Sequence, residues 1–264
     1  MGTWGMGGKY EKDPANAEES IKALRFGLEL GYRLIDTAEL YGGGLAEEIV
    51  GQAIKNHPRQ EIFIISKVWQ DRLGYQEIIA AVEGSLKRLA SDYIDLYLIH
   101  WSKENRSKKI VPLEETMSAL EFLANKKLIK YIGVSNAGVD LLKQTQSYLK
   151  KFKLAANQIE FNLIDRSAQK EILPYCQSHD IKLIAYRPLT KGNLSWAENL
   201  LIKKLCVKYN KTPAQIILNW LMGLNLIPIP KASNLNHLRE NFGALGWSMN
   251  NEDIELINKT NFNN

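Results

Sequence analysis

The stretch LIDTAELYGGG, residues 34–44, places two groups that could take part in proton transfer close together in the chain. Asp36 ends an apolar run, and Tyr41 follows five residues later, directly before three glycines. A carboxylate can hold and orient a cation, and a phenol held by its neighbours can donate a proton to a developing alkoxide. The glycines would let the loop turn sharply beside the tyrosine. The stretch therefore favours acid–base chemistry.

Two further titratable groups follow the next apolar runs. Lys67 comes after IFIIS, and His100 comes after IDLYLI. The Lys67 ammonium would favour the phenolate of Tyr41 and lower its pKa from about 10, while Asp36 would keep Lys67 charged. His100 could hydrogen-bond a substrate oxygen or polarise Tyr41. These four residues together predict a general acid assembled for a developing alkoxide.

Each of these residues alone has a plainer explanation. An aspartate after a strand often caps a helix, and a lysine there usually reaches solvent. A single histidine near a core is more often a packing residue, and Tyr41 could be a surface aromatic. The coincidence favours chemistry, because complementary groups at the ends of three successive strands should lie within a few ångströms of one another.

Short, nearly continuous apolar runs alternate with helix-length segments whose apolar residues are spaced by three and four. Helices are expected at 17–31, with Gly31 as the C-cap, at 75–90, at 113–127, and after Thr212, with Pro213 at the first helical position. The runs predict strands at 33–36, 62–66, 94–100, 129–134, 155–160, 181–186 and 225–229.

This rhythm predicts the α/β class and a single (β/α)8 TIM barrel that spans residues 1–264 as one domain. No Pro/Gly/Ser-rich linker divides the chain. An eighth strand should come first, but only MGTWG is available for it. The first strand is therefore expected to be truncated, and two explanations stay open: the barrel closes with a stub, or the true start lies upstream.

The active site of such a barrel is built from the loops that follow the strands. The polar residues at the later strand ends should thus face the same end of the barrel as the first four. They are Ser135, Asn136, Gln158, Glu160, Tyr186, Arg187 and Lys231.

The composition is that of an ordinary globular protein, with 45% hydrophobic and 24% charged residues. No apolar run is long enough to span a membrane, and the N-terminus lacks the pattern of a signal peptide. Cys176 and Cys206 are isolated, which favours buried thiols in a reducing cytoplasm and no metal site. The net charge is +5, but the densest basic run, 103–110, has no aromatic residue to stack a base, so nucleic-acid binding is not expected.

The chain resembles the aldo-keto reductases over nearly its whole length, and particularly a prokaryotic subgroup similar to methylglyoxal and 2,5-diketogulonate reductases. Each matching piece is weak alone, but seven in order at the family's spacing are specific. They are GYRLIDTAELYGGGLAEEIVGQAI (31–54), FIISKVW (63–69), DYIDLYLIHW (92–101), GVSN (133–136), NQIEFN (157–162), AYRPL (185–189) and IPKASNLNHLREN (229–241).

The resemblance implies reduction of an aldehyde or ketone by NADPH, with hydride from C4 of the nicotinamide and a proton from Tyr41. It implies Asp36, Tyr41, Lys67 and His100 as the catalytic residues. No G-x-G-x-x-G follows a strand, in keeping with a cofactor bound without a Rossmann fold.

The resemblance also implies an extended cofactor site. Tyr186 would stack on the nicotinamide, Ser135, Asn136 and Gln158 would hold its carboxamide, and 187–194 would contact the pyrophosphate. Lys231 would pair with the 2′-phosphate of NADP, and Glu240 and Asn241 would receive the adenine. The full expected set is Thr3, Trp4, Asp36, Ser135, Asn136, Gln158, Tyr186, Arg187, Pro188, Leu189, Lys191, Lys231, Ala232, Ser233, His237, Glu240 and Asn241.

Two departures from the family pattern concern specificity. His237 stands where many members have an arginine, so NADP is expected with NAD less excluded than usual; Arg239 is two residues further on. The chain ends about 20 residues after Asn241, which suggests an open pocket and broad specificity for small carbonyl compounds. Its expected lining is Trp4, Tyr41, Trp69, His100 and Trp101; for the three tryptophans, packing under the barrel rim is the alternative.

Two other functions stay open. A protein of this fold could be a catalytically weak cofactor-binding sensor or a structural protein, although it would not need all four catalytic residues. An aldolase or isomerase could use Lys67 to form a Schiff base, although Asp36 should keep that lysine protonated. The resemblance implies a monomer.

Overall fold

The computed structural model describes residues 1–101, 110–192 and 195–262, with the side chains of 195–196 excepted. Within these ranges, seven parallel strands form one sheet in which each strand pairs with the next along the chain. The strands are β1 (Leu34–Asp36), β2 (Phe63–Trp69), β3 (Ile94–His100), β4 (Ile129–Ser135), β5 (Leu154–Glu160), β6 (Lys182–Tyr186) and β7 (Leu226–Pro228).

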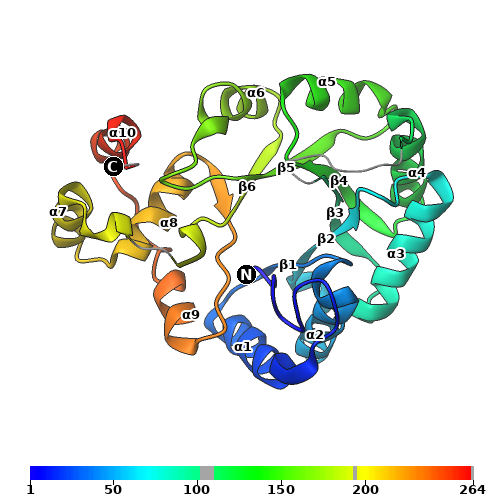
Figure 1. Ribbon diagram of the computed structural model, residues 1–264, viewed down its shortest axis with the longest axis horizontal. Coiled ribbons are helices and arrows are strands. Elements are labelled where there is room, and N and C mark those ends of the chain that lie inside the picture. Colours follow the sequence, from blue (N-terminus) through cyan, green and yellow to red (C-terminus); the bar gives the residue numbers. More distant parts are fainter. Residues whose placement is uncertain (102–109, 193–194, 263–264) are drawn as a thin grey trace.

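The helices surround this sheet as an outer ring, with α7 and α10 lying outside α8 (Figure 1). They are α1 (Ala17–Leu30), α2 (Leu45–Ile54), α3 (Tyr75–Leu89), α4 (Leu113–Asn125), α5 (Val139–Tyr148), α6 (Ile172–Ser178), α7 (Leu200–Tyr209), α8 (Pro213–Gly223), α9 (Leu235–Phe242) and α10 (Asn251–Lys259). The expected caps are present: Gly31 is left-handed after α1, and the Thr212 hydroxyl accepts from the Gln215 N–H before α8.

Residues 1–3 close the ring between β1 and β7. The Asp36 N–H donates to the Met1 carbonyl, and the Thr3 N–H donates to the Asp36 carbonyl. On the other side, the Gly2 N–H donates to the carbonyl of Pro230, just after β7. The short segment thus stands where the first strand of a (β/α)8 barrel belongs. The predicted barrel is confirmed, and residues 1–3 hold the place of its first strand.

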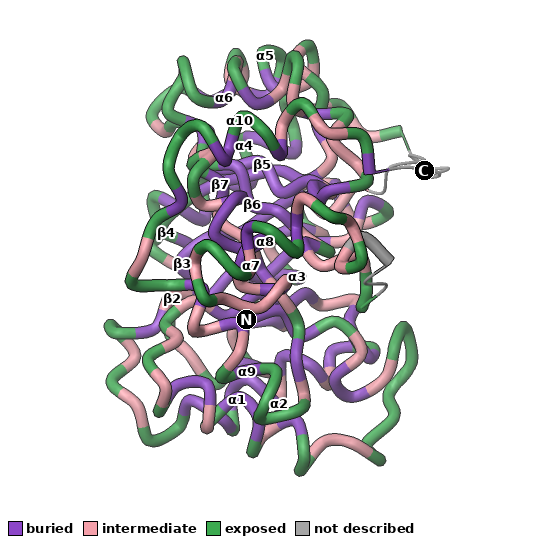
Figure 2. The backbone as a smooth tube through the Cα atoms, turned by 90° about the vertical axis from the view of Figure 1, so that its left-hand side faces the viewer, coloured by how far each residue is buried: buried purple, intermediate pink, exposed green. Residues whose placement is uncertain are grey.

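Two hydrophobic layers hold the barrel together. Ile65, Leu96, Leu98, Ile184 and other inward-facing residues form a small cluster inside the sheet. A much larger cluster fills the space between the strands and the helices. The tube view shows the same arrangement, with buried strands in the middle and exposed segments outside (Figure 2).

The barrel interior is tight enough to require a glycine on β4. A Cβ at Gly133 would come within 2.4 Å of a Leu98 methyl and 2.8 Å of the Ala156 carbonyl oxygen. Both distances are shorter than real Cβ contacts allow. A side chain at this position would therefore push β4 away from its neighbours, just below the polar end of the barrel.

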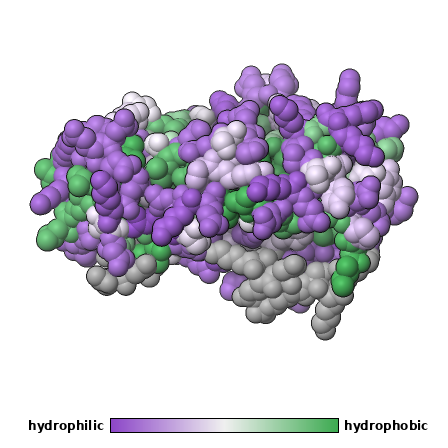
Figure 3. All heavy atoms as spheres, turned by 90° about the horizontal axis from the view of Figure 1, so that it is seen from above, coloured by the Kyte–Doolittle hydropathy of each residue, from purple (hydrophilic) through white to green (hydrophobic). Residues whose placement is uncertain are grey.

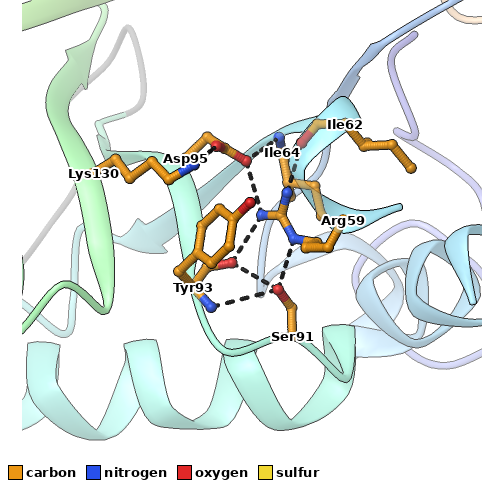
Figure 4. A network of polar contacts seen from close by, with 7 residues as sticks. All are labelled: Arg59, Ile62, Ile64, Ser91, Tyr93, Asp95 and Lys130. Atoms are coloured by element: carbon orange, nitrogen blue, oxygen red, sulfur yellow. Dashed lines mark hydrogen bonds and ion pairs between the residues drawn. The ribbon is translucent and has the colours of Figure 1, made fainter. Parts of the chain in front are cut away.

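A polar network ties the strands together at their N-terminal end (Figure 4). Asp95, at the start of β3, accepts from Arg59 Nη2 at 2.8 Å, from Lys130 Nζ at 2.9 Å and from the Ile64 N–H at 3.0 Å. The Tyr93 ring lies between the two cations, 4.0 Å from Arg59 Cζ and 3.9 Å from Lys130 Nζ. This network joins β2, β3 and β4 at the end opposite the predicted site.

The predicted strands are confirmed, but the predicted end of β2 is wrong. The strand continues through Lys67 to Trp69, so Lys67 lies within it and does not follow it. Every helix within the described ranges is too short or too polar to cross a membrane. The face seen in Figure 3 is mostly hydrophilic, with small groups of hydrophobic residues between the polar ones. Most of the basic run 103–110 lies outside the described residues.

Candidate active site

Strand parity gathers the predicted polar residues at one end of the barrel. Side chains two residues apart on a strand share a face. On β2, Lys67 therefore faces inward with Ile65, and on β3, His100 shares the face of Leu96 and Leu98. The same parity places four residues near the C-terminal ends of the other strands on the inward face: Asp36, Ser135, Gln158 and Tyr186.

Lys67 is the centre of the polar group. Its Nζ donates to Asp36 Oδ1 at 2.8 Å, to the Thr37 carbonyl at 2.7 Å and to the Tyr41 hydroxyl at 3.3 Å. Three acceptors thus take the three hydrogens of the ammonium. Burial lowers the pKa of Lys67, and the carboxylate of Asp36 opposes that change. The second Asp36 oxygen accepts from Gln158 Nε2 at 2.7 Å, so the carboxylate is held on both sides.

Tyr41 is buried beside this pair. Because its oxygen accepts from Lys67, its own hydrogen is left for another acceptor. Burial raises the pKa of Tyr41 well above 10, the Asp36 carboxylate adds to the rise and Arg187 opposes it. The expected lowering by Lys67 is therefore wrong for this structure, since desolvation disfavours the phenolate more strongly. The phenol keeps its proton at neutral pH.

The glycines after Tyr41 bring two loops together. Gly42 and Gly43 have φ of 56° and 55°, a left-handed conformation that favours glycine. The Gly42 N–H donates to the Lys9 carbonyl, and a Cβ there would lie 2.2 Å from the Gly7 carbonyl oxygen. The N-terminal loop that carries Trp4 therefore packs closely against the Tyr41 loop.

His100 lies between Tyr41 and Trp69, with its ring centroid 5.7 Å and 5.2 Å from theirs. Its Nδ1 is buried, and no partner for it is found among the described residues. Burial, together with the charge of Lys67, lowers the pKa of His100 from 6.5 to about 3. The imidazole is therefore neutral at physiological pH and can present a hydrogen-bonding nitrogen to a ligand oxygen.

The expected pocket tryptophans divide into two groups. The Trp4 ring meets Tyr41 edge-on at 4.9 Å, and the Trp69 ring meets His100 edge-on at 5.2 Å. Trp101 packs against the large hydrophobic cluster, and its carbonyl accepts from Asn136 Nδ2 at 2.6 Å. Trp4 and Trp69 thus border the polar centre, whereas core packing, the alternative, describes Trp101 better.

The residues expected at the nicotinamide form a connected group. The Tyr186 hydroxyl donates to Asn136 Oδ1 at 3.0 Å, and the Ser135 hydroxyl donates to the Ile99 carbonyl at 2.9 Å. Gln158 is bound to Asp36 in this structure. Amide and hydroxyl groups therefore lie beside the Tyr186 ring, and Gln158 connects them to the Asp36–Lys67 pair. This set fits a nicotinamide with its carboxamide. Thr3 is buried, and its hydroxyl donates to the Asp36 carbonyl at 2.9 Å.

The loops after β4 and β6 hold predicted cofactor residues in an unusual backbone conformation. Asn136, Arg187 and Lys191 have φ of 52°, 51° and 57°, values that side-chain-bearing residues rarely adopt and that concentrate at functional sites. Arg187 pairs with Glu160 at 3.0 Å. Pro188 is buried, Leu189 packs against the large cluster and Lys191 is exposed. Residues 193–194 of the expected pyrophosphate loop lie outside the described residues.

The residues expected at the adenine end lie around the start of α9. Lys231 is exposed, and its Nζ donates to the Ser233 hydroxyl at 2.8 Å; Ala232 is buried. His237 is exposed in the first turn of α9, Glu240 is partly exposed and Asn241 is buried. Arg239 Cζ lies 4.6 Å from the Phe26 ring centroid. A cation thus stands before a helix N-terminus, which fits a phosphate group.

Sequence reasoning missed Glu39 and Arg72. Glu39 accepts from the Trp69 N–H at 2.9 Å and from Arg72 Nη1 at 2.5 Å. Glu39 stands within LIDTAELYGGG (34–44), between Asp36 and Tyr41. The sequence around Glu39 does not indicate its role, because its partners Trp69 and Arg72 come from a segment about 30 residues away.

Comparison with known proteins identifies this architecture. Residues 1–261 match the model of the Aldo/keto reductase family. Methylglyoxal reductase YeaE of Escherichia coli is 34% identical over 98% of this chain and 89% of its own length. Glyoxal reductase of Bacillus subtilis is 38% identical over 93% and 85%.

Solved structures agree with this match. The thermostable aldo-keto reductase Tm1743 superposes with a TM-score of 0.91 at 39% identity, covering 97% of this chain and 92% of its own. An aldo/keto reductase of Klebsiella pneumoniae in complex with NADP and acetate gives 0.86 at 33% identity, over 98% and 89%. The chain belongs to the aldo/keto reductase family. It is an NADP-dependent oxidoreductase that reduces carbonyl compounds.

Proposed function

We propose that this protein reduces small aldehydes and ketones with broad specificity, with 2-oxoaldehydes such as methylglyoxal among its substrates. Two relatives at 34% and 38% identity are named methylglyoxal reductase and glyoxal reductase. Trp4 and Trp69 beside the polar centre support a compact, partly apolar substrate pocket. We further propose that the protein works as a monomer in the cytoplasm.

The contact between Lys67 Nζ and the Tyr41 hydroxyl carries the assignment of residue roles. The reduced nicotinamide, when bound, supplies a hydride to the carbonyl carbon. Tyr41 donates its proton to the carbonyl oxygen as negative charge develops there. Lys67 then stabilises the phenolate, and Asp36 holds the ammonium in position. Neutral His100 orients the substrate oxygen through a ring nitrogen.

The remaining predicted residues hold the cofactor. Ser135, Asn136 and Gln158 bind the carboxamide, and Tyr186 stacks on the nicotinamide ring. Arg187 to Lys191 follow the pyrophosphate, and Lys231 pairs with the 2′-phosphate. The geometry gives no support to a Schiff base at Lys67, because all three ammonium hydrogens are already directed at acceptors.

The test is NADPH oxidation with methylglyoxal, followed by absorbance, in the wild type and Tyr41→Phe. Loss of the general acid should lower kcat by about 10²- to 10⁴-fold, while NADPH affinity stays within about threefold, since the change removes one hydroxyl. Equal turnover by both proteins would contradict the role of Tyr41. Cofactor binding without turnover of any aldehyde or ketone in a panel would favour the sensor.

A further inference from the structure

Glu39 uses both carboxylate oxygens to connect two segments of the barrel. Oε1 accepts from the Trp69 N–H at 2.9 Å, and Oε2 accepts from Arg72 Nη1 at 2.5 Å. The Glu39 side chain is 7% exposed, whereas that of Arg72 is 43% exposed. A buried carboxylate is costly unless it is paired, and here the partners come from the end of β2 and the turn that follows it.

The turn after β2 is fixed at several points by these contacts. The Arg72 N–H donates to the Trp69 carbonyl at 3.0 Å, so Arg72 closes the turn through its backbone and its side chain. The Trp69 indole Nε1 donates to Asp71 Oδ2 at 3.1 Å. Trp69 is thus held by its own N–H, its carbonyl and its indole, and its ring has one defined place against His100.

Glu39 also belongs to the loop that carries the proton donor. Its N–H donates to the Lys67 carbonyl at 3.3 Å, and Tyr41 is two residues further on. The same residue therefore fixes the distance between the Tyr41 loop and the end of β2. Trp69, His100 and Tyr41 form a series of edge-on ring contacts at 5.2 Å and 5.7 Å.

We infer that Glu39 and Arg72 are a positioning pair that sets the Trp69 wall of the substrate pocket and thereby the affinity for the carbonyl substrate. Among the described residues, the hydrogen bonds of the Glu39 and Arg72 side chains go to Trp69 and to each other, not to Lys67 Nζ or the Tyr41 hydroxyl. The pair acts through Trp69 and belongs to substrate binding, not to proton transfer. This inference rests on the proposed function, since it assigns a determinant of that pocket.

Two substitutions separate the parts of the pair. Glu39→Gln keeps an oxygen that can accept from the Trp69 N–H but removes the ion pair. Arg72→Met removes the cation and leaves the buried Glu39 carboxylate with the Trp69 N–H as its remaining named partner, so urea unfolding is measured beside the kinetics to show that the variant is folded. Arg72→Lys restores a charge and should recover part of the effect. Glu48→Gln is the matched control, because it breaks the 2.7 Å ion pair of Glu48 with Lys12, which is more exposed and does not touch Trp69.

We expect Glu39→Gln and Arg72→Met to raise the KM for methylglyoxal about 5- to 20-fold, with kcat and the Kd for NADPH within about threefold of wild type. Because both changes break the same contact, the double variant should be little worse than either single one. Glu48→Gln should leave both constants unchanged. Unchanged KM in both single variants, or equal losses in kcat for Glu39→Gln and the control, would overturn the inference.

A second measurement does not depend on turnover. The ¹⁵N–¹H signal of the Trp69 indole, assigned by its disappearance in Trp69→Phe, should shift in Glu39→Gln and Arg72→Met but stay in place in Glu48→Gln. An unchanged signal in the first two variants would refute the positioning role. If the wild type reduced no carbonyl compound, the proposed function would fail, and this signal would still decide whether the pair positions Trp69.

Discussion

Lys67 and Asp36 form an ion pair of 2.8 Å between Nζ and Oδ1, with side chains that are 0% and 3% exposed. Two charges in such a place lose nearly all their hydration, and the loss is offset only where each finds several partners. Here Lys67 has three acceptors, and Asp36 has a second donor in Gln158. A buried pair of this kind adds little net stability to the fold. Its contribution to the chemistry is larger, because it gives Tyr41 a fixed electrostatic environment.

Removing one partner of this pair should destabilise the protein strongly. Lys67→Met leaves the Asp36 carboxylate buried beside an apolar side chain, so we expect a loss of about 3–5 kcal/mol in the free energy of unfolding by urea. The double variant Asp36→Asn, Lys67→Met should recover part of that loss, because no charge then remains unpaired. If the double variant were less stable than Lys67→Met by as much as a second, independent substitution would cost, this account would be wrong.

His100 should contribute to the pH dependence of stability. Its pKa is lowered from 6.5 to about 3, so between these values the unfolded chain binds more protons than the folded one. The folded state is then favoured as pH rises and disfavoured as pH falls from about 6.5 towards 3, by up to about 1.4 kcal/mol per pH unit. His100→Gln should flatten this part of the curve. Parallel curves for the two proteins between pH 6.5 and 4 would show that the imidazole does not titrate as proposed.

Much of the polar end of the barrel could be predicted from the sequence, because strand ends and side-chain parity are local properties. Asp36 and His100 each end an apolar run, and parity then directs them inward. The position of Lys67 within its strand is not predicted correctly, because a lysine after an apolar run is typical of a strand end. In the structure, β2 continues for two residues beyond Lys67. A lysine that faces the barrel interior needs a buried partner of opposite charge, and Asp36 is that partner here.

Other properties of the site depend on burial and on distant partners. The positive charge of Lys67 predicts a lowered pKa for Tyr41, but burial of the phenol raises it. The role of Glu39 depends on Arg72, which comes from the turn after the next strand. Closure of the barrel by residues 1–3 depends on backbone hydrogen bonds to Asp36 and Pro230. Bonds between backbone groups leave no pattern of residue types from which they could be predicted.

The network around Asp95 should support the fold without affecting catalysis. Asp95→Ala leaves Arg59 and Lys130 without their shared partner, and Arg59 is only 19% exposed. We expect a loss of about 2–4 kcal/mol in the free energy of unfolding, with kcat/KM unchanged in protein that remains folded, because Asp95 lies at the opposite end of β3 from His100. The measurements are urea unfolding and NADPH oxidation with methylglyoxal.

The control for Asp95 is Asp180→Asn. It breaks the exposed 2.8 Å pair with Lys182 at the same end of the barrel, and exposed pairs contribute little to stability. Its unfolding midpoint should match that of wild type. If Asp95→Ala lowered kcat/KM at full stability, the two ends of the barrel would be coupled and this separation of roles would be wrong.

Lys231 should determine the choice between NADPH and NADH. It is exposed before α9, with Ser233 as its side-chain partner. His237 is expected to be a weaker phosphate ligand than arginine, because an imidazole lacks the planar guanidinium that binds phosphate through two hydrogen bonds. Lys231→Met should raise the Kd for NADPH about 10- to 100-fold and leave that for NADH within about threefold, because only NADPH carries the 2′-phosphate. Added salt should weaken NADPH binding to the wild type more than to the variant. Lys182→Met is the same substitution at the other end of the barrel and should leave the Kd values for NADPH and NADH unchanged. Equal affinity of the wild type for the two cofactors would refute the preference for NADPH.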